Sequence, residues 1–374
     1  KLYNSFWQRY LADVVSDSEL TFVSEKLAER DSRHDRMGDT RYLLEPDIKE
    51  GKGGLRDLQT LFWIVKYLYR ISDLNELVAR GVYTREETKL FLKASNFLWT
   101  VRCHLHYLAG HDEDRLTFDV QQEIARRMGY RDHSGTQGVE RLMKHYFLIA
   151  RAVGDLTRIL CAVLEEQHKK KYAKPYIPLN SPLNDLAHEF HIDSGRLSVL
   201  SQDCFEKAPL RLINIFYVSL SRKIDIHPHA LRWIRQSLKL IDERLRKNVE
   251  ANTIFLDILT SEQNPEKTLM MMNEAGVLGR FVPDFGRIVA QMQYDMYHVY
   301  TVDEHTIRAL GILYRIGAGE LVNDHPTASS VVKEVQSRRV LYLAVFFHDI
   351  AKGRQGDHSE IGSRLAKQFC IRAN

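Results

Sequence analysis

The sequence predicts a mainly α protein, in which a helical bundle region is followed by an all-α C-terminal domain, with few short strands. Two observations predict this class. Apolar residues recur at intervals of three and four along most of the 374 residues, as they do in amphipathic helices. Strand-like patterns are scarce and fall near residues 186–200. With 44% hydrophobic and 27% charged residues, the composition is that of a globular protein with a sizeable core.

Three regions are expected. Residues 1–170 predict a bundle, and a basic tract that contains prolines follows it at 167–182. Residues 171–280 predict a linker and a helical connecting region, with a short strand pair at 186–192 and 196–200. Residues 281–374 predict the C-terminal domain. The expected helices cover residues 1–14, a segment around 20–27, 55–71, 85–109, 137–166, 208–222, 228–246, 252–261, 264–275, 303–316, 330–351 and 359–372.

Composition excludes several classes of protein. The net charge of +4 is too small over this length to indicate nucleic-acid binding. The chain contains no apolar stretch of the roughly 18 residues that a membrane span needs. No signal-peptide pattern opens the sequence. Its four cysteines lie in apolar, helix-like stretches, and no two of them have CxxC spacing. We therefore expect a cytoplasmic protein whose thiols are reduced and lie in the core.

The most informative feature is the dipeptide His348-Asp349, which follows the apolar run 343–347. That run should carry an imidazole and a carboxylate into the interior, where a carboxylate is normally paired or holds a metal. His305 upstream and His358 downstream, after a glycine-flanked loop, add candidate ligands. A helix cap or a surface ion pair with no functional role would also explain the dipeptide. The apolar run and the neighbouring histidines nevertheless favour a metal site.

His305 is expected in the first turn of its helix, and His348-Asp349 near the end of another. Side chains at adjacent helical positions point about 100° apart. His348 and Asp349 can therefore reach one ion only if that ion lies beside the end of their helix. Imidazole and carboxylate ligands suit Mn, Fe, Zn or Mg, and such an ion would activate water. Lys352 and Arg354 follow at positions suited to binding phosphate oxygens.

A second feature is the glycine-rich stretch 47–57, where Lys49, Lys52 and Arg56 surround three glycines before a helix. Backbone N–H groups at such a helix start can bind phosphate. The stretch lacks the Gly-Lys-Ser/Thr ending of a Walker A loop. Spacing alone favours a structural turn over a nucleotide site.

The pattern of His305 followed by His348-Asp349 resembles the HD superfamily of metal-dependent phosphohydrolases. The longer strings 293–308, 348–354 and 356–359 are similar to one family within it, together with the string 42–58. This family comprises the bifunctional uridylyltransferase/uridylyl-removing enzymes that modify the nitrogen-signalling PII protein. The resemblance covers nearly the whole chain.

The resemblance implies an HD site that hydrolyses the uridylyl group from a tyrosine of PII and releases UMP. It implies a divalent metal, Mn or Mg, held by His305, His348, Asp349 and His358, with Lys352, Asp349 and His358 as catalytic residues. Lys49 and Arg56 would belong to the transferase half and contact UTP. The resemblance places the transferase's catalytic loop before Lys1. It places the fourth HD aspartate and the glutamine-sensing ACT domains after Asn374.

Two alternatives remain open at this point. An HD phosphohydrolase could act on a nucleotide second messenger instead of a protein. A regulatory scaffold with a vestigial metal site could bind PII without chemistry.

Overall fold

The computed structural model describes most of the chain, and everything below concerns the residues that it describes. These are residues 19–38, 40–71, 73–133, 135–169, 177–178, 190–193, 195–294, 299–354 and 356–373, with positions 2, 5, 6 and 9. Most of the expected helix at 1–14, the tract after residue 169 and residues 186–189 therefore lie outside the described residues. The chain divides into two compact units, which are described separately: residues 1–131 with 141–165, and residues 132–140 with 166–374.

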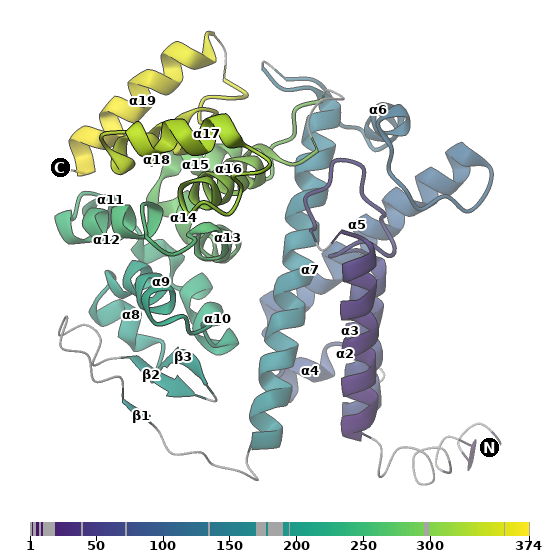
Figure 1. The fold of residues 1–374 in the computed structure, drawn as a ribbon. Helices are drawn as coiled ribbons and strands as arrows, with labels where there is room; N and C mark the ends of the chain where they lie inside the picture. The colour runs from purple at the N-terminus through teal and green to yellow at the C-terminus, as the bar shows by residue number, and fades with distance from the viewer. Residues whose placement is uncertain are drawn as a thin grey trace. The chain divides into compact units, whose positions relative to one another are not determined.

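The first unit is built from helices, as expected (Figure 1). Helix α2 packs on α3, α3 packs on α5, and α5 packs on both α4 and α6. The long α7 supplies a continuous apolar face that includes Leu142, Tyr146, Val153 and Leu160, all fully or almost fully buried. The helices are α2 (Glu19–Arg36), α3 (Leu55–Tyr69), α4 (Glu76–Ala79), α5 (Arg85–Ala109), α6 (Phe118–Arg127) and α7 (Gly138–Lys169).

Local sequence signals explain where α5 begins and ends. The Thr84 hydroxyl accepts a hydrogen bond from the backbone N–H of Glu87, and the Glu87 carboxylate accepts one from the N–H of Thr84. This reciprocal capping satisfies donors that the first helical turn leaves without partners. At the other end Gly110 adopts φ 75°, a left-handed conformation that stops the helix at little steric cost.

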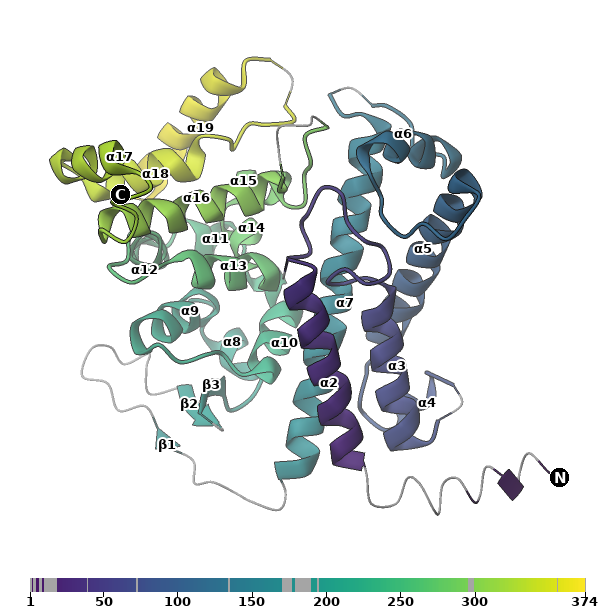
Figure 2. The same cartoon turned by 45° about the vertical axis from the view of Figure 1, so that its right-hand side comes forward.

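The second unit begins with a small antiparallel sheet in the order β1-β2-β3, formed by Ile177–Pro178, Phe190–Asp193 and Arg196–Val199. The expected strand pair is thus confirmed within 190–199. The rest of the described unit is helical, as Figure 2 shows from a second side. It comprises α8 (Asp203–Lys207), α9 (Arg211–Arg222), α10 (Pro228–Gln236), η2 (Leu238–Leu240), α11 (Glu243–Arg246), α12 (Val249–Leu259), α13 (Glu266–Ala275), α14 (Val277–Phe281), α15 (Pro283–Ile288), α16 (Val302–Gly317), α17 (Pro326–Val331), η3 (Val332–Glu334), α18 (Arg338–Phe347) and α19 (His358–Ala373).

Two expected helices are broken, so those predictions are wrong. The expected helix at 228–246 splits into α10, η2 and α11, because the Asp242 carboxylate accepts the N–H of Leu245 and starts a new helix. The expected helix at 330–351 splits into part of α17, η3 and α18, where the Ser337 hydroxyl accepts the N–H of Val340. A short 3₁₀ helix with no buried residue, η2 or η3, lies at each break.

Aromatic packing joins the helices of the C-terminal part of the second unit. The ring of Phe255 on α12 lies 5.4 Å from Phe281, 5.8 Å from Phe346 and 5.9 Å from Phe369, measured between centroids. Phe285 stacks on Phe346 at 5.2 Å. Contacts of this kind add about 0.5–1.5 kcal/mol each beyond the area they bury. They fix α18, whose C-terminal end carries the candidate site.

The cysteines are free thiols, but the expectation that all four lie in the core is wrong. Cys204 is buried and Cys161 is half-buried, whereas Cys103 and Cys370 are exposed. Both exposed residues occupy the outer faces of amphipathic helices, α5 and α19. None of the described helices has the length and apolar character that crossing a membrane requires.

Candidate metal centre

The first ligand candidate, His305, is the fourth residue of α16. The helix begins at Val302, and the N–H of His305 donates to the Thr301 carbonyl at 2.8 Å. The half-buried imidazole therefore projects from the first turn, as expected.

The second and third candidates lie where α18 stops. The helix buries Tyr342, Phe346 and Phe347, and His348 forms its C-terminal cap, followed by Asp349 in the turn. Asp349 is buried at 9% exposure. The His348 side chain is 38% exposed, so the expectation that the apolar run buries both groups is wrong for the imidazole. After the helix ends at Phe347, only His348 is exposed, and Asp349, Ile350 and Ala351 are again buried.

These three side chains meet. Among the described residues, His305, His348 and Asp349 each offer a ligand atom, and these atoms all lie within 4.8 Å of one another. Ligands that share an ion at about 2.1 Å lie up to about 4.2 Å apart, so a small closure would complete the geometry. The imidazole centroids of His305 and His348 are 5.5 Å apart. The donor set of two imidazoles and a carboxylate fits a divalent transition metal or Mg²⁺.

The hydrogen bonding of His348 leaves Nε2 as the ring nitrogen that a cation can bind. Its Nδ1 lies 2.6 Å from the Val345 carbonyl oxygen, which can only accept, so Nδ1 carries the proton. Its Nε2 then faces the Asp349 carboxylate at 3.2 Å. A neutral ring would direct a lone pair at that carboxylate, which is unfavourable unless Nε2 is protonated or a cation lies between them.

The ionisation of the pair follows from these contacts. The hydrogen bond with Asp349 raises the pKa of His348 above its ordinary value, against a smaller opposing effect of burial. Burial alone would raise the pKa of Asp349. Hydrogen bonds from His348 and Lys352, with their charges, together hold that pKa well below its usual range. Asp349 is therefore an anion at neutral pH, the form that binds a cation.

Lys352 lies beside the cluster. Its Nζ lies 2.9 Å from Asp349 Oδ2 and donates to Gln293 Oε1 at 2.7 Å. Arg354, expected to bind phosphate, instead forms an ion pair with Asp284. Gln293 opens the string 293–308, but no charge or spacing pattern of an uncharged amide indicates its contact with Lys352.

A buried network fixes the start of α16 to the loop that carries Gln293. The carboxylate of Asp303 is fully buried and accepts the side-chain amide of Asn273 at 2.7 Å and the N–H of Ala290 at 3.1 Å. The N–H of Val302 donates to the Gln291 carbonyl at 2.9 Å. These bonds fix the first turn of α16, from which His305 projects, so Asp303 has a positioning role.

Glu304 is a second buried carboxylate on α16. Burial raises its pKa to about 7, against the opposing charge of Arg308, whose Nε donates to Glu304 at 2.9 Å. The Arg308 guanidinium lies over the Tyr300 ring at 4.5 Å from its centroid. Asp303 and Glu304 thus both have hydrogen-bond partners within the protein.

His358 is not among the clustered residues. It is exposed at the first position of α19, beyond the turn at Gly353 and Gly356, both of which adopt positive φ. His298 lies outside the described residues. The structure therefore brings together three of the four expected ligands.

The glycine-rich loop directs its N–H groups inward. Gly51 N–H donates to the Asp47 carbonyl at 3.1 Å, Gly53 N–H to the Asp57 carboxylate at 2.8 Å, and Gly54 N–H to the Gly51 carbonyl at 2.8 Å. Side chains at 53 and 54 would meet backbone oxygens at 2.5 and 2.7 Å, which explains these glycines by close packing. With these amides occupied, the loop is a structural turn and not a phosphate cradle.

The two cations expected to bind nucleotide here have protein partners. Lys49 Nζ lies 3.4 Å from Asp114, and Arg56 Nη2 lies 2.9 Å from Glu50. Arg56 also donates to Gln59 at 3.1 Å. Their role in nucleotide binding stays a prediction.

Three family models match successive parts of the chain. "GlnD PII-uridylyltransferase" matches residues 21–161, "Uridylyltransferase GlnD third domain" matches 190–281, and "HD domain" matches 302–374. The HD match includes the whole His305, His348 and Asp349 cluster. No solved structure gives a significant match.

Curated relatives match along almost the entire chain. The chain is 56% identical over 374 residues to a bifunctional uridylyltransferase/uridylyl-removing enzyme of Azospirillum brasilense, covering 100% of this chain and 40% of the relative. Enzymes of the same name from Novosphingobium aromaticivorans and Rhodospirillum rubrum are 52% and 53% identical, over 99% and 98% of this chain and 41% and 39% of their own lengths. The chain thus spans about two fifths of the length of these relatives. It belongs to the GlnD family of uridylyltransferase/uridylyl-removing enzymes, with GlnD uridylyltransferase domains followed by an HD domain.

Proposed function

We propose that the HD domain of this chain removes UMP from a uridylylated PII protein in a reaction that depends on a divalent metal, Mn²⁺ or Mg²⁺. The observation that carries the proposal is that ligand atoms of His305, His348 and Asp349 lie within 4.8 Å of one another, on a segment that matches the HD domain. The relatives' names supply the uridylyl group.

The reaction is a phosphodiester hydrolysis. Water adds to phosphorus, the bond from phosphorus to the tyrosine oxygen breaks, and that oxygen takes up a proton as UMP leaves. His305, His348 and Asp349 would hold a divalent cation, which would supply Lewis-acid activation of water. Lys352 keeps an ammonium group beside the carboxylate, where it favours the anionic phosphodiester electrostatically. We propose His358 as a further ligand or catalytic group, which would require α19 to approach the cluster.

We propose the remaining partners from the same relationship. PII is the protein substrate, UTP is the uridylyl donor of the transferase half, and glutamine acts through domains outside these residues. The cytoplasm is the proposed location.

Release of UMP from uridylylated PII in the presence of Mn²⁺ or Mg²⁺ tests the proposal. We expect His348→Ala to lose at least about a hundredfold in rate, since removal of a ligand removes the activated water. Glu243→Gln is the matched control, because this exposed residue on α11 pairs only with Lys247 among the contacts described. Chelation should abolish release, and re-addition of metal should restore it in the control but not in His348→Ala.

Metal content provides an independent measurement. The wild-type chain should bind Mn²⁺, and His305→Ala and Asp349→Asn should both lose it. Unchanged UMP release in His348→Ala would refute the assignment of the site. A chain that hydrolyses free nucleotides but not uridylylated PII would support the nucleotide alternative.

A further inference from the structure

The ammonium group of Lys352 has two partners among the described residues, one charged and one neutral. Its Nζ lies 2.9 Å from Asp349 Oδ2 and donates to the side-chain carbonyl oxygen of Gln293 at 2.7 Å. Only 14% of the Lys352 side chain is exposed. A lysine ammonium has three N–H donors, so one donor remains for a ligand after these two contacts.

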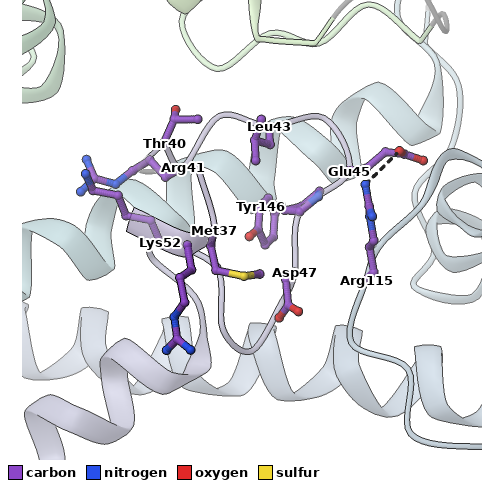
Figure 3. Close-up of a pocket in the computed structure, with 12 residues that line it drawn as sticks. Met37, Thr40, Arg41, Leu43, Glu45, Asp47, Lys52, Arg115 and Tyr146 are labelled. Carbon is purple, nitrogen blue, oxygen red and sulfur yellow. Dashed lines mark ion pairs between the residues drawn. The ribbon is translucent and has the colours of Figure 1, made fainter. Parts of the chain in front are cut away.

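The neutral amide of Gln293 orients the ammonium of Lys352 without cancelling its charge. A carboxylate in the same place would add a second negative charge beside the ammonium and neutralise it. Figure 3 shows the contrasting case in the first unit, on the wall of a cavity, where the carboxylate of Glu45 lies 3.7 Å from Arg115. An ammonium that is held by an amide keeps more of its attraction for an anionic ligand than a cation in such a pair.

The segment that carries Gln293 is fixed to the start of α16. The N–H of Ala290 donates to the buried Asp303 carboxylate, and the Gln291 carbonyl accepts the N–H of Val302. Ala290 adopts φ 58°, a left-handed conformation that residues with a side chain rarely adopt. Such a conformation persists only where the surrounding contacts enforce it, so residues 290–293 have a defined course.

A glycine lets the same segment lie against the turn that carries Lys352. Gly353 adopts φ 74°, and a Cβ at this position would overlap the side-chain amide of Gln291. The residue after Lys352 therefore packs directly against the residue two positions before Gln293. This close packing fixes the two segments beside the hydrogen bond between Gln293 and Lys352.

We propose, on the basis of the function inferred above, that Gln293 is a positioning residue that holds the ammonium of Lys352 toward the phosphodiester. As water adds to phosphorus, negative charge grows on the phosphoryl oxygens. A cation that is already held in position stabilises this charge more than one that has to be reoriented. Gln293 should therefore act on the catalytic step through Lys352, and metal binding should not depend on it.

Competitive acetylation of lysines in the folded chain, measured by mass spectrometry, tests the contact without any hydrolysis. Gln293→Leu removes the acceptor, so Lys352 should react about threefold or more faster than in wild type, relative to the exposed Lys333. Gln293→Glu keeps an acceptor oxygen and should keep Lys352 protected. Gln336→Leu is the matched control, because Gln336 is exposed. Circular dichroism identifies any variant that fails to fold.

A glycine pair gives a second test that leaves Gln293 and Lys352 unchanged. Gly353→Ala should displace Gln291 and also speed the acetylation of Lys352. Gly319→Ala is the matched control, because Gly319 also has a positive φ of 79°, but a Cβ there would meet only Val322, at 4.0 Å.

A double-mutant cycle separates positioning from a general structural effect. It compares UMP release from uridylylated PII by wild type, Gln293→Leu, Lys352→Met and the variant with both changes. Gln293→Leu should lower kcat about 10–100-fold, the effect of losing a hydrogen bond to a charged group, and should change KM less than about threefold. The double variant should be as slow as Lys352→Met alone, because Gln293 acts through Lys352.

Metal binding provides the remaining measurement. By calorimetry the Mn²⁺ affinity of Gln293→Leu should stay within about threefold of wild type, whereas His348→Ala should lose Mn²⁺. Loss of Mn²⁺ by folded Gln293→Leu, or independent effects of the two changes in the cycle, would assign Gln293 a purely structural role and overturn the inference.

The acetylation result keeps this inference separate from the proposed function. Acetylation of Lys352 at the wild-type rate in Gln293→Leu would overturn the positioning role even if wild type released UMP. If wild type bound Mn²⁺ but released no UMP, the proposed function would fail. Acetylation and Mn²⁺ affinity would then still decide whether Gln293 holds Lys352.

Discussion

The buried carboxylate of Asp57 holds the first unit together at the glycine-rich loop. Only 3% of the residue is exposed. It accepts hydrogen bonds from Arg33 Nη2 at 2.5 Å, His34 Nε2 at 2.9 Å and Gly53 N–H at 2.8 Å. The carboxylate on α3 thereby joins the end of α2 to the loop that leads into α3.

Asp57→Asn should strongly destabilise the first unit. The change keeps the size of the side chain but leaves the charge of Arg33, itself 6% exposed, without its closest counter-ion. Removing one partner of a buried ion pair costs about 3–5 kcal/mol. For a domain of this size each kcal/mol lowers the melting temperature by about 2–4 °C, so the expected decrease is about 6–20 °C.

Differential scanning calorimetry of the whole chain, with the transitions of the two units fitted separately, measures the effect. Asp31→Asn is the matched control, because Asp31 is 62% exposed in its side chain and pairs with Arg30 at the surface. An exposed pair of this kind contributes about 0–1 kcal/mol. If Asp57→Asn and Asp31→Asn proved equally mild, the structural role of Asp57 would be refuted.

The pH dependence of the same difference gives a sign test. Burial alone would raise the pKa of Asp57, but hydrogen bonds from His34 and Gly53 and the charges of His34 and Arg33 together lower this pKa below its ordinary value. A carboxylate with a lowered folded-state pKa stabilises the fold above its unfolded-state pKa and loses this effect as pH falls through the folded-state pKa. The difference between wild type and Asp57→Asn should therefore be constant above about pH 5 and shrink on further acidification. A difference that grows with acid would contradict the reasoning.

Two further predictions follow from burial. In the folded chain a thiol reagent should modify Cys103 and Cys370 but not Cys204. Cys204 is buried, and burial raises the pKa of its thiol to about 11. Mass spectrometry of the labelled peptides checks this, and early labelling of Cys204 would contradict it. Asp303→Ala should destabilise the second unit by about 2–4 kcal/mol, because it removes the buried carboxylate that accepts hydrogen bonds from Asn273 and Ala290. Asp324→Ala at an exposed position should have little effect. Thermal melting measures both, and equal stability of the two variants would refute the positioning role.

The helices show which boundaries apolar periodicity can predict and which it cannot. The apolar repeats predicted the bounds of α3, α5, α9, α16 and α19 to within a few residues. A helix that buries one face repeats apolar residues at intervals of three and four, so this burial is visible in the sequence. They could not show that the stretches 228–246 and 330–351 are interrupted. Each new helix begins at one capping side chain, Asp242 or Ser337, and residues of these types also occur on helix surfaces.

For the site, the sequence by itself determined the chemistry of the ligands, since His305, His348 and Asp349 differ from their neighbours in what they can bind. Only the tertiary structure decided that these three meet within 4.8 Å, that His358 lies apart, and that Gln293 and Asp303 support the cluster. It likewise decided that the glycine amides point inward and that Arg41 and Lys52, not Lys49 and Arg56, line a cavity. Residue type fixes which bonds a group can make, whereas the partner that it finds depends on how segments distant in sequence pack together.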